Sequence, residues 1–155
     1  MSRAFVKEPE GAEAFEDLPD RPVSPHPNLV TAEGLARIER ELERLHADYA
    51  AAQAASDRAL LARTARDLRY WTSRRATAQL TAPPAGAANV LFGSTVAIER
   101  DDGRRQTFRI VGEDEADPAR GTLSHVAPLA RALLGKKAGD VVKAGQSEAE
   151  IVEVR

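Results

Sequence analysis

The chain has 155 residues, with 22 Lys and Arg against 24 Asp and Glu, 43% hydrophobic residues and no cysteine. Without cysteine it can form no disulfide, no thiolate metal site and no cysteine nucleophile. The formal net charge of −2 gives no bulk attraction to nucleic acid or anionic membranes, so any such contact must depend on a local patch. No stretch approaches the ~18 apolar residues of a membrane span, and the N-terminus lacks the apolar run of a signal peptide. We therefore expect a cytoplasmic protein with no membrane partner.

Residues 1–30 are predicted to form a disordered, acidic and proline-rich tail. They contain six acidic residues against three basic ones, and five of the nine prolines. Their few large apolar residues follow no period, so they cannot offset the entropy of ordering this much backbone. The proline run at 22–27 is typical of an extended, partly polyproline-like chain. Binding of a partner by this tail is the alternative interpretation.

Residues 31–80 are predicted to form an antiparallel helical hairpin. Thr31 is a suitable N-cap, and Glu33 follows in the first turn. From there apolar residues recur at heptad spacing, at Leu35, Ile38, Leu42, Leu45 and Tyr49. The phase then jumps, because the next strong apolar residues are Leu61, Leu68 and Trp71.

A chain reversal near residue 55 explains this jump, with Ser56 or Asp57 capping the second helix. The two apolar seams then pair in antiparallel order, with residue 38 opposite 71, 42 opposite 68 and 49 opposite 61. Thr64 and Arg75 fall at seam positions where apolar side chains would pack better. We therefore expect looser packing of the second helix near both.

The remainder of the chain predicts a linker and a small β-rich domain, which makes the fold class α+β. Residues 81–88 contain Pro83 and Pro84, end the hairpin and form the linker. Residues 89–155 switch to a period of two and are close to the lower size limit for an independent core. The predicted elements are a β-hairpin of 95–98 and 107–111 turning at 101–103, strands at 121–126, 140–142 and 149–154, and a short helix at 128–134.

No residue pattern indicates an enzyme or a cofactor site. His26, His46 and His125 have no spacing that suggests a shared metal, and no nucleophile elbow or glycine-rich phosphate loop is present. The acidic segment 112–117 lacks the alternate-position spacing of a calcium loop. It could bind a cation, cap turns or contact a partner.

The second helix of the hairpin is distinctly basic. Only Asp57 and Asp67 oppose its cations, which are Arg58, Arg63, Arg66, Arg69, Arg74 and Arg75. An ordinary solvated helix face and a surface for nucleic acid or an acidic partner both agree with this pattern.

Three segments after the hairpin carry a family resemblance: 92–96 (FGSTV), 108–117 (FRIVGEDEAD) and 127–136 (APLARALLGK). Together with the hairpin, and in this order, they resemble the GreA/GreB transcription elongation factors over residues 31–155. The resemblance implies an N-terminal antiparallel coiled coil and a C-terminal FKBP-like domain. It also implies that this domain docks at the rim of the secondary channel of bacterial RNA polymerase while the coiled coil enters the channel. We expect the protein to be a monomer.

In that family, acidic residues at the coiled-coil tip help to hold Mg²⁺ and activate water for cleavage of backtracked RNA. The tip here, residues 54–58, offers one carboxylate, Asp57, beside Arg58. The hairpin is also about two heptads shorter, one per arm, which reduces its reach by roughly 10 Å. In this it is similar to Rnk, a Gre-like polymerase binder with a truncated coiled coil. We expect no cofactor, apart from a magnesium ion shared with the polymerase active site.

The leading hypothesis is therefore a regulator that binds polymerase, occupies the channel and modulates elongation. The alternative is a true cleavage-stimulating factor that acts through Asp57. Arg58, Arg63 and Arg66 lie nearest the tip and are expected to contact nascent RNA or the channel wall.

The resemblance places polymerase docking at a strand-to-helix corner, which here reads Val126, Ala127 and Pro128. Only Pro128 matches the family pattern at this corner, and it also suits the first turn of a helix. A prolyl isomerase is a third hypothesis, from fold analogy alone. The domain has only Phe92 and Phe108 as aromatic residues, too few for an aromatic-lined proline pocket.

Overall fold

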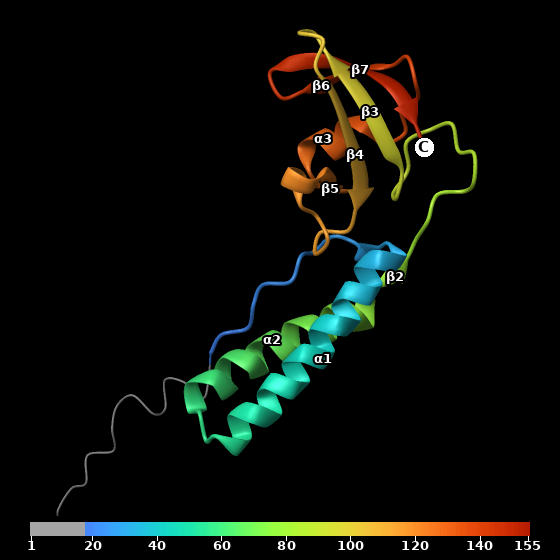
Figure 1. The fold of residues 1–155 in the computed structure, drawn as a ribbon. Helices are drawn as coiled ribbons and strands as arrows, with labels where there is room; N and C mark the ends of the chain where they lie inside the picture. The colour runs from blue at the N-terminus through green and yellow to red at the C-terminus, as the bar shows by residue number, and fades with distance from the viewer. Residues whose placement is uncertain (1–17) are drawn as a thin grey trace, which may run out of the picture. The chain divides into compact units, whose positions relative to one another are not determined.

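The computed structural model describes residues 18–155, so most of the predicted tail lies outside the described residues. Its fold is α+β, as predicted, with two long helices followed in the chain by a β-rich domain (Figure 1). The contacts separate two compact units. One contains residues 38–76 with the described part of 1–25, and the other contains residues 26–37 and 77–155. The first turns of the hairpin therefore belong with the β-rich domain, which the sequence did not predict.

The hairpin consists of α1 (Ala32–Ala54) and α2 (Arg58–Thr77). The helices are antiparallel, because Arg75 near the end of α2 pairs with Glu39 near the start of α1, with 3.1 Å between Nε and Oε1. The reversal occupies residues 55–57, and Ser56 adopts a positive φ of 52° there. The predicted break in the leucine phase is thus a turn. Among the described residues, no helix has both the length and the apolar character needed to cross a bilayer.

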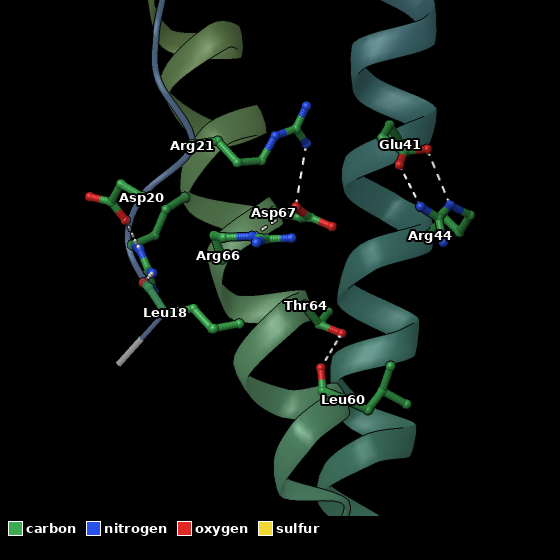
Figure 2. Close-up of polar contacts among 10 residues, drawn as sticks. Leu18, Asp20, Arg21, Glu41, Arg44, Leu60, Thr64, Arg66 and Asp67 are labelled. Atoms are coloured by element: carbon green, nitrogen blue, oxygen red, sulfur yellow. Dashed lines mark hydrogen bonds and ion pairs between the residues drawn. The ribbon is translucent and has the colours of Figure 1, made fainter. Parts of the chain in front are cut away.

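The seam of the hairpin is partly polar. On α1 the residues buried along it are Ile38, Leu45 and Ala52, seven positions apart. On α2 Thr64 is buried, and its hydroxyl donates a 2.7 Å hydrogen bond to the Leu60 carbonyl (Figure 2). This back-bond satisfies the hydroxyl inside its own helix, so Thr64 occupies the predicted position without an unpaired polar group.

The prediction that Arg75 occupies the seam is wrong. Its side chain is about half exposed, and its ion pair with Glu39 lies at the surface, where the guanidinium keeps its hydration. The neighbouring Arg74 is buried instead, at 2% exposure. It has interaction partners there, as a charge removed from water requires.

Two short strands join the chain entering the hairpin to the chain leaving it, and we call this pair the clasp. Strand β1 (Leu29–Val30) pairs in parallel with β2 (Gln79–Leu80). The Asn28 carbonyl accepts a 2.8 Å hydrogen bond from the Gln79 amide, and the Val30 carbonyl a 3.0 Å bond from the Thr81 amide. Residues 29–30 were predicted within the disordered tail and 79–80 within the hairpin. Both expectations are corrected, because backbone pairing and the burial of Val30 offset the cost of ordering.

The β-rich domain contains a five-stranded sheet in the order β5-β4-β3-β7-β6. Its neighbours are antiparallel except for β4 and β5, which are parallel. Each predicted strand is present within a few residues of its expected bounds. The strands are β3 (Thr95–Arg100), β4 (Arg105–Val111), β5 (Thr122–Ser124), β6 (Val141–Ala144) and β7 (Ser147–Val154).

Helix α3 (Pro128–Leu133) packs with the sheet, and the 3₁₀ turn η2 (Pro118–Arg120) precedes β5. The core between α3 and the sheet is apolar. Its residues Ile98, Ile110, Leu133 and Ile151 are each 0% exposed. Alternation along the strands directs the three isoleucines to one face of the sheet, and Leu133 comes from α3. The result is a continuous apolar cluster of the kind that stabilises a small domain.

Candidate functional site

The hairpin tip is built around Asp57, which begins α2 as its N-cap. Its Oδ1 accepts a 3.0 Å hydrogen bond from the Leu60 amide, and its carbonyl accepts a 2.9 Å bond from the Leu61 amide. The sequence left Ser56 and Asp57 open as caps, and the structure selects Asp57. One carboxylate oxygen of the predicted tip acid is therefore used in helix capping.

The tip does not form a magnesium site by itself. Mg²⁺ requires six oxygen ligands at close range, and Asp57 offers one exposed carboxylate. The nearest acid on α1, Asp48, is paired with Arg44 at 2.7 Å. Within residues 18–155, no group of three or more His, Asp or Glu side chains is placed to hold a metal ion. The described residues at the tip thus do not fit a magnesium site.

The three arginines predicted to contact RNA or the channel differ in their surroundings. Arg58 and Arg63 are exposed. Arg66 is about two-thirds covered, and its Nε lies 3.6 Å from Asp67 Oδ1, beyond hydrogen-bond distance. Because Arg63, Arg66 and Arg69 are three residues apart, they follow one side of α2. The structure therefore places Arg63 and Arg66 on the same side of α2. The binding roles of all three predicted arginines stay predictions.

Residues 18–25, which we call the strap, lie along α2 rather than forming a free tail (Figures 1 and 2). Arg21 pairs with Asp67 at 3.3 Å, and its guanidinium lies 4.0 Å from the centre of the Tyr70 ring. Asp20 pairs with Arg69 at 2.6 Å. The prediction of a disordered tail is therefore wrong for residues 18–25, because opposite charges and an aromatic ring on α2 hold them.

The corner predicted to dock on polymerase is a well-defined turn into α3. Pro128 is exposed at the first helical position, and Ala127 is the N-cap residue without a side-chain cap. Ser124 organises the turn, since its carbonyl accepts from the Ala127 amide at 2.9 Å and its hydroxyl from the Val126 amide at 3.3 Å. Ala127 also packs against the core. Pro128 is thus the member of the trio with an exposed side chain, and docking at this corner stays a prediction.

The acidic segment 112–117 contacts the start of α1. Glu115 accepts a 2.6 Å hydrogen bond from the Thr31 hydroxyl, and that hydroxyl accepts a 2.9 Å bond from the Gly34 amide. Thr31 is therefore the predicted N-cap, extended by a carboxylate. Nearby, hydrogen bonds from the Glu33 backbone amide and from Arg109 lower the pKa of the Glu33 carboxyl. The sequence left cation binding, capping and partner contact open for this segment. Glu115 takes part in capping, because it extends the Thr31 cap of α1.

The aromatic residues of the β-rich domain belong to its core. Phe92 is 7% exposed and Phe108 packs against the same cluster. A cavity of about 510 Å³ lies beside the linker, but residues 83–88, Ser94 and the last two residues line it. Because no aromatic side chain lines this cavity, it gives no support to a prolyl isomerase.

Comparison with known proteins agrees with this architecture. The family described as "Transcription elongation factor, GreA/GreB, C-term" matches residues 85–155. The transcription elongation factor GreA of Desulfovibrio desulfuricans is 36% identical over 135 residues, which cover 86% of this chain and 80% of that protein. The chain belongs to the GreA/GreB family. GreA of Pseudomonas putida gives a similar match, 37% identical over 134 residues and covering 83% and 81% of the two chains.

Other relatives of this GreA/GreB protein match over a shorter stretch. GreA of Alkalilimnicola ehrlichii is 51% identical over 71 residues, and this match spans 43% of the chain and 45% of that relative. The crystal structure of GreA factor homolog 1 of Thermus thermophilus aligns with 84% of this chain and 99% of its own, at 22% identity and a TM-score of 0.41. The relatives are named as elongation factors rather than enzymes, in keeping with the expectation of no enzymatic activity of its own.

Sequence reasoning missed the strap, because it treated residues 1–30 as one segment. A signal was nevertheless present. Asp20 and Arg21 have opposite charges to their partners Arg69 and Asp67, and three prolines within 19–25 limit the conformations that must be given up on docking.

Proposed function

We propose that this Gre-like protein binds bacterial RNA polymerase through residues 89–155 at the rim of the secondary channel. The 31–80 hairpin then enters the channel and modulates elongation by occupying it. The observation that supports occupancy over chemistry is the tip, whose one carboxylate caps α2 and, among residues 18–155, belongs to no group of three or more side chains placed to hold a metal. At 1.5 Å per residue, the 20 residues of α2 give an arm of about 30 Å.

Electrostatics supports a role for the arm in contact with nascent RNA or an acidic channel wall. Arg58 and Arg63 are exposed near the tip, and the chain as a whole carries a net charge of −2. Attraction therefore comes from the local arrangement on α2 and should weaken as salt rises.

Binding to purified bacterial core polymerase, measured by native gel shift, tests the proposal. We expect a micromolar or tighter complex. Pro128→Glu should weaken it about tenfold, since it puts a charge at the centre of the docking corner. Lys143→Glu, an equally exposed change on β6, is the control and should leave binding intact. Absence of any micromolar complex would contradict the proposal.

The alternative, cleavage of backtracked RNA through Asp57, is separable from occupancy. A stalled, backtracked complex with Mg²⁺ is incubated with the wild type and with Asp57→Asn, which keeps a capping oxygen but removes the charge. Unchanged transcript lengths in both samples are expected from occupancy. Shortened transcripts that disappear in the Asn variant would support the cleavage hypothesis instead.

A further inference from the structure

We infer that the strap (residues 18–25) is an intramolecular competitor of RNA for the surface formed by Arg69, Tyr70 and Trp71 of α2. The inference rests on the proposed function, in which α2 contacts nascent RNA, and adds to it a means of regulation. It is carried by the contacts of the strap on α2, which Figure 2 shows in part.

The strap makes the two kinds of contact by which proteins hold single-stranded nucleic acid. Such proteins pair cations with phosphates and stack bases on aromatic rings. Here the carboxylate of Asp20 lies 2.6 Å from Arg69 Nε, where a phosphate oxygen would bind. The Arg21 guanidinium lies 4.0 Å from the centre of the Tyr70 ring and 5.8 Å from that of Trp71. A planar cation on that ring excludes a base from the same position.

Two neighbouring aromatic rings lie beneath the strap. Tyr70 and Trp71 meet edge to face, with ring centres 5.1 Å apart. Both side chains are half-buried while the strap is in place. Two neighbouring aromatic rings beside a row of arginines form a surface with stacking and charge together, which a plain solvated helix face lacks.

Leu18 of the strap lies beside two of the arginines predicted to contact RNA. Leu18, with Ala59, Arg63 and Arg66, lines a cavity of about 290 Å³ on the tip side of the strap. The Leu18 carbonyl accepts a 3.2 Å hydrogen bond from Arg69 as well, so one arginine is held by two strap groups. An RNA strand following Arg63, Arg66 and Arg69 would therefore have to displace the strap.

The contacts are weak enough for displacement. In the Asp20–Arg69 pair the side chains are 74% and 50% exposed, and in the Arg21–Asp67 pair they are 37% and 30% exposed. Exposed pairs of this kind contribute little individually. When a cover is closed most of the time, the apparent affinity for a competitor equals the intrinsic affinity multiplied by the small open fraction. Opening the strap should therefore increase RNA affinity by a measurable factor.

The test uses the full chain with a double variant, Asp20→Asn with Arg21→Ala. These changes remove one negative and one positive charge, so the net charge is unchanged and any effect comes from the strap. We expect the double variant to bind a fluorescein-labelled 12-nucleotide single-stranded RNA about fivefold more tightly, by anisotropy at low salt. Trp71 is the single tryptophan of the chain, and its quenching by acrylamide should increase in the free double variant.

Val23→Ala, a change at an exposed strap residue with 47% exposure, is the matched control and should alter neither measurement. Equal or weaker RNA binding by the double variant would overturn the inference, and so would a lack of RNA binding by both proteins. Polymerase binding is measured on the same samples. If the polymerase complex forms normally but the double variant binds RNA no more tightly, only the inference about the strap is rejected. If neither RNA nor polymerase is bound, the proposed function is rejected as well.

Discussion

The two compact units are stabilised in different ways. The β-rich unit has a core of fully buried aliphatic side chains, among them Ile98, Ile110 and Ile151. The hairpin unit has a thin seam with a threonine at its centre, a buried arginine, and ion pairs that tie the strap and both helices together. The first arrangement is insensitive to salt and fixes a shape, whereas the second responds to charge. Under the proposed function, the first design suits a base that docks and the second suits an arm that adjusts.

Truncation in the two interiors should give the largest effects and compares them directly. Ile110→Ala removes a fully buried side chain of the sheet and should lower the free energy of unfolding by about 3 kcal/mol in urea titrations. Ile38→Ala, in the seam, should cost less, since the half-buried side chains around it can close part of the space. Val141→Ala on β6, 59% exposed, is the control for the sheet. A seam truncation as costly as the core truncation would contradict the comparison.

Two glycines beside the start of the hairpin should give an intermediate effect. A Cβ at Gly112 would clash with the Leu29 carbonyl oxygen, which is backbone and cannot move aside. Gly112→Ala should therefore lower the unfolding free energy by about 2 kcal/mol, measured by thermal denaturation. Gly34→Ala meets side-chain atoms, the flexible carboxylate of Glu115 at 2.6 Å and the Thr31 hydroxyl at 3.3 Å, and it gains helix propensity. It should be nearly neutral, and equal effects at the two positions would be inconsistent with this geometry.

The smallest effect concerns pH. Hydrogen bonds from its own backbone amide and from Arg109 lower the pKa of Glu33 below its ordinary value of 4.5. The unfolded chain then binds more protons than the folded one in this range, so the stabilisation is present above pH 4.5 and is lost as pH falls through the folded pKa.

Urea titrations at pH 6 and pH 3.5 measure this effect. Glu33→Gln should reduce the difference between the two pH values by less than about 0.5 kcal/mol, because the Arg109 pair is largely exposed. Glu148→Gln on β7 is the control. A larger pH dependence in the Gln variant than in the wild type would contradict the assignment.

The elements with strong local signals were predictable from the sequence. The break in the leucine phase between Tyr49 and Leu61 located the turn, and period-two alternation located the strands. The clasp and the strap were not predictable in this way, because each depends on partners 46 to 51 residues away along the chain. The exchange of Arg74 for Arg75 in the interior was also missed. Periodicity predicts which positions of a helix face the interior. It does not predict which long cationic side chain reaches a surface partner, as Arg75 reaches Glu39.

In the candidate site, the place of Asp57 at the tip followed from the sequence, as did the position of Pro128 at the start of α3. The cap of α2 did not, because the sequence left Ser56 and Asp57 open and only the fold selects Asp57. The role of Glu115 at Thr31 did not, because an acidic loop can serve several purposes and only the fold brings it to the helix start. Binding roles for Arg58, Arg63 and Arg66 remain predictions that the polymerase and RNA measurements decide.

The clasp has a consequence for how such arms can differ in length. Because Leu29–Val30 and Gln79–Leu80 are paired in register, the chain enters and leaves the hairpin at one fixed place. Equal numbers of residues can then be added to or deleted from both helices without any change in the backbone pairing below them. Closing a somewhat longer loop costs only a fraction of a kcal/mol, growing with the logarithm of its length. The clasp thus makes the arm an exchangeable module. Its length can be changed by whole heptads, in evolution or by engineering.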